Sequence, residues 1–220
     1  KEVTQNLSLL IVCNLAKDKN CFKKIFDEAF TSQFISFAIN NKDPDVIFNI
    51  YSALSLFPVN GLIKKLENED LWESIKTNLT ELSQFDMAEL LNLIDQIIIF
   101  YPMFLDKYDF WPCIFEKSDD FSLRNKEGFA NVLTEYFDRT SNYAVQDIEQ
   151  PPLCFAVNGG FEFLCEILEI VTNPLLFYNI SFCLIRLAVS NPEIFGNIIH
   201  DLHLISNLNI FLKKFHYFFR

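Results

Sequence analysis

Glycine is scarce in this chain, with 5 among 220 residues. Sheet-rich proteins need glycine in their tight turns, so the scarcity favours long helices joined by short loops. Basic residues are also in deficit: 18 Lys and Arg face 29 Asp and Glu, a formal net charge of −11. Nucleic acids and anionic membranes both attract basic surfaces, so the charge argues against such partners. A basic peptide partner fits the charge, and acidity that serves only solubility is the alternative.

Motifs for metal, nucleotide or covalent chemistry are nearly absent. The six cysteines never form a C-x-x-C pair, and most stand among apolar residues, which is typical of free cysteines in a reducing compartment. We therefore expect a cytoplasmic location, with nuclear shuttling as an alternative. His200 and His203 fit one side of a helix, but no convincing third ligand is near, so we expect no metal and no cofactor. Cys21, at a helix start, is either structural or the nucleophile of an enzyme.

Long hydrophobic runs are missing too. The longest apolar run, 97–105, is too short to cross a membrane and contains Pro102, so we expect no membrane insertion. No signal-peptide pattern is present. The chain begins at Lys1 rather than Met, and helical patterns reach both of its ends. We therefore expect a segment of a longer protein.

Hydrophobic residues are plentiful, by contrast, at half of the chain, and phenylalanine is the outlier with 25 residues. A chain so rich in aromatics is able to bury a large core and is not disordered. The excess of phenylalanine is explained by biased composition together with core filling. A groove lined by phenylalanine is the alternative.

Apolar helical segments recur at a regular spacing. Equivalent segment ends fall at Leu15 and Leu56, which are 41 residues apart, and at Ile99, 43 residues further on. Leu187 follows after 88 residues, or two more steps of 44. A period of this length built from helices alone is the mark of an α-solenoid. We expect an all-α fold of about five helical units in a single domain, 1–220, in which these segments are buried helices.

The first unit has the clearest anatomy. A helix ends at Ala16, a polar turn follows with Asn20 as the expected N-cap, and a second helix covers 32–39. Asp43 is the expected N-cap and Pro44 the first residue of a third helix that extends to residue 57. A later helix is expected from Met87, capped by Asp86. A short helix, a second helix and a longer third helix then form one unit.

This anatomy resembles the armadillo family. The stretch Asn-Leu-Ala-Lys-Asp-Lys-Asn at 14–20 resembles the junction of two armadillo repeats, and 40–57 resembles a polar turn followed by a third helix. Near the C-terminus, 157–168 resembles the glycine turn and second helix, and 186–193 resembles another junction. The resemblance implies an armadillo/HEAT-like right-handed α-solenoid with degenerate repeats. The segment 139–152 is polar and ends in Gln-Pro-Pro, so we interpret it as an inserted loop, with a domain break as the alternative.

In the armadillo family the third helices line a concave groove, where Asn side chains hydrogen-bond an extended peptide. An amide suits this role because it offers both a donor and an acceptor. In the nuclear-import members a Trp stands four residues before that Asn. This chain retains one Asn and no Trp, which departs from an importin-type peptide receptor. The successive Asn and Trp positions hold Asn14 and Leu10, Ser55 and Tyr51, Ile98 and Ile94, and Arg186 and Phe182.

A mixture of aromatic and polar side chains could replace this series of Asn side chains, because interfaces are enriched in aromatics and Arg. The alternatives are that Tyr51 and Phe182 pack inward and that Arg186 forms an internal ion pair with a neighbouring carboxylate. The candidate groove residues are Asn14, Tyr51, Ser55, Asp95, Asn179, Phe182 and Arg186.

The sequence therefore predicts a non-enzymatic scaffold that binds a protein or peptide along the concave face of a solenoid. One alternative is a regulatory helical domain of a larger cytoskeletal, formin-like protein or of a nuclear-transport, importin-like protein. An α-helical enzyme domain is the alternative of another class.

Overall fold

Helices form all the regular structure of the residues that the computed structural model describes, which are 2–41, 43–79, 82, 84–117, 121–140 and 152–198. No strand occurs in these ranges, which confirms the all-α prediction for them. The chain divides into two compact units, Lys1–Phe104 and Leu105–Arg220.

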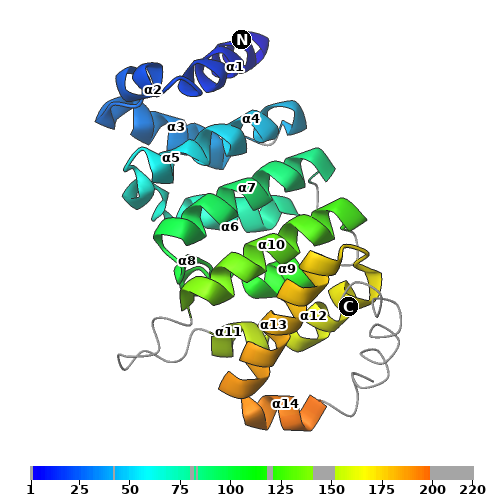
Figure 1. The fold of residues 1–220 in the computed structure, drawn as a ribbon. Coiled ribbons are helices and arrows are strands. Elements are labelled where there is room, and N and C mark those ends of the chain that lie inside the picture. Colours follow the sequence, from blue (N-terminus) through cyan, green and yellow to red (C-terminus); the bar gives the residue numbers. More distant parts are fainter. Residues whose placement is uncertain are drawn as a thin grey trace. The chain divides into compact units, whose positions relative to one another are not determined.

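In the first unit, the helices pack in two rows. α1 packs against α4 and α4 against α7, while α3 packs against α6 (Figure 1). The elements of this unit are α1 (Glu2–Ala16), α2 (Lys19–Ile25), α3 (Glu28–Asn40), α4 (Pro44–Leu54), α5 (Leu56–Val59), the 3₁₀ helix η1 (Ile63–Leu66), α6 (Glu69–Asn78) and α7 (Gln84–Phe100).

Side-chain caps set several helix starts in this unit. Asp18 caps α2, because its carboxylate accepts the backbone N–H groups of residues 20 and 21, each at 2.9 Å. Asp27 caps α3 in the same way. The expected cap Asn20 is therefore wrong by two residues, and a cap at residue 27 explains why α3 begins before 32. Pro44 is the first residue of α4, as predicted.

Two other expected boundaries differ from the structure. The third helix expected to reach residue 57 ends at Leu54, and α5 begins at Leu56 after a break at Ser55. Asp86, the expected cap of the later helix, lies inside the first turn of α7 and is buried.

The core of the first unit contains a cluster of phenylalanine rings. Phe26 contacts Phe22, Phe57 and Phe34 with ring centroids 4.6, 5.0 and 5.3 Å apart. All four rings are buried. Core filling therefore accounts for this part of the phenylalanine excess.

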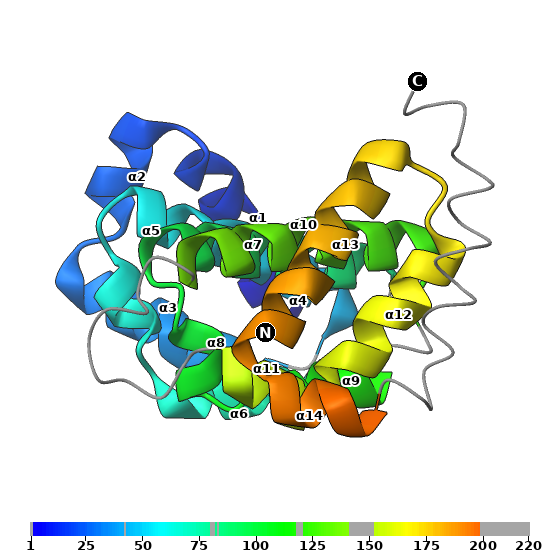
Figure 2. The same ribbon diagram turned by 60° about the horizontal axis from the view of Figure 1, so that its bottom comes forward.

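The second unit is built around α10, α12 and α13, each of which packs against the other two (Figures 1 and 2). The short helix α8 (Phe104–Lys107) spans the boundary between the units. The remaining helices are α9 (Trp111–Lys117), α10 (Leu123–Thr140), α11 (Pro152–Val157), α12 (Gly160–Ile170), α13 (Pro174–Ser190) and α14 (Pro192–Ile198).

Local chemistry fixes the starts of α12 and α13. Gly159 precedes α12 with φ of 98°, a left-handed conformation that glycine adopts without strain. Asn173 caps α13 by accepting the N–H groups of residues 175 and 176, and Pro174 stands at the first helical position. The expected glycine turn and second helix at 157–168 are thus present as local structure.

The inserted loop expected at 139–152 differs at both edges. Arg139 and Thr140 belong to α10, because the helical hydrogen bonding continues that far, and Pro152 begins α11. The stretch 141–151 lies outside the described residues.

Aromatic rings also fill the core of the second unit. Trp111 contacts Phe155 and Tyr136 with ring centroids 4.9 and 5.0 Å apart, and it also contacts Phe129. These four side chains are fully buried.

Candidate interaction surface on α13

One helix of the second unit is apolar on both of its sides. The side of α13 that packs against α10 and α12 buries Leu176, Phe177, Ile180, Cys183, Leu184 and Leu187. The expectation of a buried helix holds for this side and is wrong for the opposite one.

The opposite side carries five exposed apolar residues at alternating steps of three and four, which places them on one helix face. Their exposed fractions range from 40% to 76%. We refer to them as the α13 stripe. They are Leu175, Tyr178, Phe182, Ile185 and Val189.

Two aromatic rings and a cation form a row along this stripe. The rings of Tyr178 and Phe182 are stacked, with centroids 6.4 Å apart and planes 4° apart. The guanidinium of Arg186 lies 4.2 Å from the centroid of Phe182. Each member is one turn from the next, so the helix itself sets their order. Tyr and Arg are residue types that dominate binding energy at interfaces.

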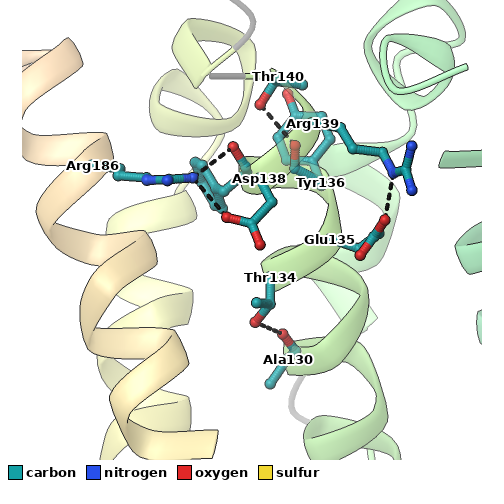
Figure 3. Close-up of polar contacts among 9 residues, drawn as sticks. Ala130, Thr134, Glu135, Tyr136, Asp138, Arg139, Thr140 and Arg186 are labelled. Carbon is teal, nitrogen blue, oxygen red and sulfur yellow. Dashed lines mark hydrogen bonds and ion pairs between the residues drawn. The ribbon is translucent and has the colours of Figure 1, made fainter. Parts of the chain in front are cut away.

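Arg186 is also anchored to the neighbouring helix α10 (Figure 3). Its Nη1 donates to the carboxylate of Asp138 at 2.9 Å and to the backbone carbonyl of Phe137 at 3.0 Å. The side chain is still 30% exposed. Arg186 therefore pairs with a neighbouring carboxylate, but the pair lies at the surface and is not the internal ion pair of the alternative.

The last turns of α10 are polar around this anchor (Figure 3). Arg139 and Glu135 form an ion pair one turn apart, and the Thr140 hydroxyl donates to the carbonyl of Tyr136. Asp138 is itself 56% exposed. The apolar stripe on α13 therefore has a charged border on its α10 side.

Of the seven candidate groove residues, three lie together on α13. Phe182 and Arg186 are in contact, and Asn179 is a half-buried residue of the same helix. The other four, Asn14, Tyr51, Ser55 and Asp95, belong to the first unit.

Two of those four are buried in the first unit, so neither lines an exposed groove. The Tyr51 side chain is 4% exposed, and burial, with a smaller effect of the charge on Asp86, raises its pKa. Ser55 is 5% exposed, and its hydroxyl donates to the carbonyl of Ser52. Inward packing of Tyr51, the alternative for that residue, is what the structure has.

The remaining two are accessible. Asp95 is half-buried on α7, and its carboxylate accepts a long hydrogen bond of 3.5 Å from Gln96. Asn14 is exposed on α1, close in sequence to a second and shorter apolar row. That row consists of Leu7, Ile11 and Leu15.

Sequence reasoning missed most of the α13 stripe and the partner of Arg186. Tyr178 and Ile185 stand at helical spacing from Phe182, and this spacing is the signal that could have found them. Asp138 is 48 positions from Arg186 and carried no signal in the sequence.

The described side chains offer little for catalysis. Burial raises the pKa of Cys13, Cys165 and Cys183 to about 12, so these thiols stay protonated near neutral pH. Cys21 is half-buried in the first turn of α2. His200 and His203 lie outside the described residues.

Two features are absent from the described residues. Within these ranges, no three His, Cys, Asp or Glu side chains gather as a metal site would require. Over the same part of the chain, no helix has the length and apolar character needed to cross a membrane.

Comparison of the chain with models of protein families, with curated proteins and with solved structures finds no match.

Proposed function

We propose that this chain is a non-enzymatic scaffold that binds a protein or peptide partner, and that the α13 stripe makes the contact. The fold we propose for it is an armadillo/HEAT-like right-handed α-solenoid of about five units. The proposal rests on one observation above all: five large apolar side chains lie exposed in a single row, with a stacked Tyr–Phe–Arg series inside it.

Helix packing within the units supports the solenoid. In the first unit α1, α4 and α7 pack in succession, and α3 packs against α6, so these helices form two separate rows. Within each row a helix contacts the next one along, as in stacked repeats. The spacing of 41 to 44 residues in the sequence adds to this support.

The energetics of the stripe support a binding role. An exposed apolar row is unfavourable in water, and removing a large aliphatic or aromatic side chain from water contributes about 1.5–3 kcal/mol. Aromatic rings and Arg contribute further through stacking and cation–π contacts. Because Phe182 and Arg186 are already held in place, their side chains lose less conformational entropy when a partner binds.

The structure indicates which residue should be substituted to test binding. A charge reversal at Arg186 would set a Glu against Asp138 and disturb the join between α10 and α13, so its effects would be mixed. Tyr178→Glu avoids this problem, since the Tyr178 side chain is 56% exposed and its ring stacks on Phe182 of the same helix. Val157→Glu is the matched control, because Val157 is 61% exposed on α11.

The experiment is quantitative affinity purification from cells that express the tagged chain in three forms: unmodified, Tyr178→Glu and Val157→Glu. We expect Tyr178→Glu to lose a set of partners that Val157→Glu retains, with both variants unfolding within a few degrees of the unmodified chain. A benzophenone amino acid at position 185 should cross-link the same partners. Equal retention by both variants, or no cross-link at position 185, would contradict the proposal.

A further inference from the structure

A half-buried carboxylate, that of Asp106, is hydrogen-bonded by two neighbouring helices of the second unit. Asp106 of α8 accepts a hydrogen bond from the indole Nε1 of Trp111 of α9 at 2.8 Å. It also accepts from the hydroxyl of Tyr136 of α10, at 2.9 Å to Oδ2 and 3.2 Å to Oδ1. Both donors are fully buried. The carboxylate therefore joins α9 to α10 inside the aromatic core.

Among the described residues, no charged side chain forms an ion pair with this carboxylate. Burial raises the pKa of Asp106 to about 6, and the hydrogen bonds from Trp111 and Tyr136 are the opposing causes. Partial burial thus disfavours the charged form of the carboxyl group, and the two hydrogen bonds favour it.

Several charged groups of the adjoining helices have other contacts or stand away from Asp106. On its own helix, the ammonium of Lys107 lies over the ring of Tyr108. On α10, Glu135 pairs with Arg139 and Asp138 pairs with Arg186. On α9 the charged residues, Glu116 and Lys117, stand at the far end of the helix from Trp111. The titratable group that faces Asp106 from α10 is the Tyr136 hydroxyl.

The turn after Asp106 presents the indole to it. Asp109 has a positive φ of 47°, and its N–H donates to the carbonyl of Asp106. The N–H of Phe110 donates to the carbonyl of Leu105. This tight left-handed turn brings Trp111 back over α8, so the carboxylate and indole are held together by the backbone as well.

We propose that Asp106 is a proton-binding site that reverses its hydrogen bond with Tyr136 in mildly acidic solution. An ionised carboxylate only accepts, so both partners donate to it. Once a solvent proton binds, the carboxyl group has an O–H to donate. An indole N–H can only donate, whereas a phenol can donate or accept, so the Tyr136 bond is the one that reverses. This inference does not depend on the proposed function.

The first unit contains a matched internal control. The indole Nε1 of Trp72 also donates at 2.8 Å, but its acceptor is the backbone carbonyl of Leu66. Trp72 is as fully buried as Trp111, and these two are the only tryptophans of the chain. A peptide carbonyl does not titrate, so we expect the indole N–H signal of Trp72 to be independent of pH.

The experiment follows the two indole N–H signals of the full ¹⁵N-labelled chain by NMR from pH 5.2 to 8. Trp72→Phe assigns them. We expect the Trp111 signal to shift with a midpoint near pH 6, as burial implies for Asp106, and the Trp72 signal to stay constant. Asp106→Asn should abolish the shift. Tyr136→Phe should raise the midpoint, since the ionised carboxylate loses a donor.

Two results would overturn the proposal. One is a Trp111 signal that is constant over the whole range in the unmodified chain. The other is an equal shift of that signal in Asp106→Asn. If Asp106→Asn does not fold, the ¹³C shift of the Asp106 carboxyl in the unmodified chain replaces it. A carboxyl that stays ionised throughout the range contradicts the proposal directly.

Discussion

Each unit buries one tryptophan completely, and the two indoles differ in what accepts their N–H. In the first unit Trp72 donates to the backbone carbonyl of Leu66, and in the second unit Trp111 donates to the carboxylate of Asp106, both at 2.8 Å. The distance from donor to acceptor is therefore the same, and the charge of the acceptor is different. If Asp106 binds a proton as proposed, the surroundings of Trp111 respond to pH and those of Trp72 do not.

The surrounding packing reinforces this contrast. Trp72 contacts Phe104, with ring centroids 4.8 Å apart, in a core whose neighbouring cluster is made of phenylalanine. Trp111 contacts Tyr136, whose hydroxyl reaches the same carboxylate. In the first unit the indole N–H thus donates to a backbone carbonyl. The second unit holds a half-buried titratable group in a network of hydrogen bonds.

The largest effect is expected from removal of each tryptophan. Trp72→Ala and Trp111→Ala should each lower the free energy of unfolding by about 3–5 kcal/mol, because a large cavity remains. The loss in Trp111→Ala should be greater at pH 7.5 than at pH 5, since the ionised Asp106 also loses a donor. Urea denaturation at both pH values, with a probe in each unit, measures this. Equal losses for Trp111→Ala at the two pH values would break the comparison.

The pH dependence of the unmodified chain comes next in size. The folded state raises the pKa of Asp106 from 3.8 to about 6, so it binds a proton more tightly than the unfolded state does. The contribution of Asp106 to stability is therefore complete below about pH 4 and is lost as pH rises to 6. The loss should be on the order of 2–3 kcal/mol, from the value of one pKa unit.

Asp106→Asn should remove this contribution. We expect the difference in unfolding free energy between pH 5 and pH 7.5 to shrink in the variant, when both chains are compared in urea. Trp72→Phe is the control, because its site holds no titratable acceptor. A pH profile of Asp106→Asn that is parallel to that of the unmodified chain would show that the sensitivity arises elsewhere.

The helical fold could be predicted from the sequence because the patterns that indicate it are local. Scarce glycine, apolar periodicity and the Asp43–Pro44 start all act within a few residues, and the helices appear close to where they are expected. Caps were less predictable. Asp18 and Asn20 are both good capping residues in one polar turn, and only the backbone path decides that Asp18 accepts the N–H groups.

The α13 stripe and its contacts were harder to predict from the sequence, for two reasons. α13 is apolar all round, so periodicity cannot say that Ile180 faces the core and Ile185 faces outward. Contacts between distant residues leave no pattern either: Asp106 meets Tyr136 across 30 positions, and Arg186 meets Asp138 across 48. Arg186 stood out only because a charge in an apolar helix requires a partner or solvent, and the structure supplies both.

A smaller effect should come from Gly160, which packs under the aromatic core of the second unit. A Cβ on this residue would lie 2.1 Å from the ring of Phe155 and 2.5 Å from its carbonyl oxygen. Gly160→Ala should therefore cost about 1–3 kcal/mol through overpacking. Because Phe155 contacts Trp111, the indole signal of Trp111 should shift while that of Trp72 does not.

Gly196→Ala is the matched control, since a Cβ there meets nothing within 4 Å. Gly196 lies within α14, so alanine should be neutral or stabilise the helix by up to about 1 kcal/mol. Thermal unfolding and the indole spectra of both variants test the pair. A change in the Trp72 signal with Gly160→Ala would mean that the two cores do not respond separately.

The smallest effect separates the ion pairs of the two units. Arg186 and Asp138 are 2.9 Å apart, with 30% and 56% of their side chains exposed, whereas Lys65 and Glu28 are 3.4 Å apart and 37% and 90% exposed. Double-mutant cycles with Arg186→Met and Asp138→Asn should give a coupling of about 0.5–1 kcal/mol, and the Lys65–Glu28 cycle a value closer to zero. Arg186 is ordered beforehand by the Phe137 carbonyl and the Phe182 ring, so its pair costs less entropy to form. Repeating both cycles in 0.5 M salt should weaken the first coupling without abolishing it, because the contact is partly shielded from solvent. Equal couplings in the two units would mean that this ordering adds nothing to the pair.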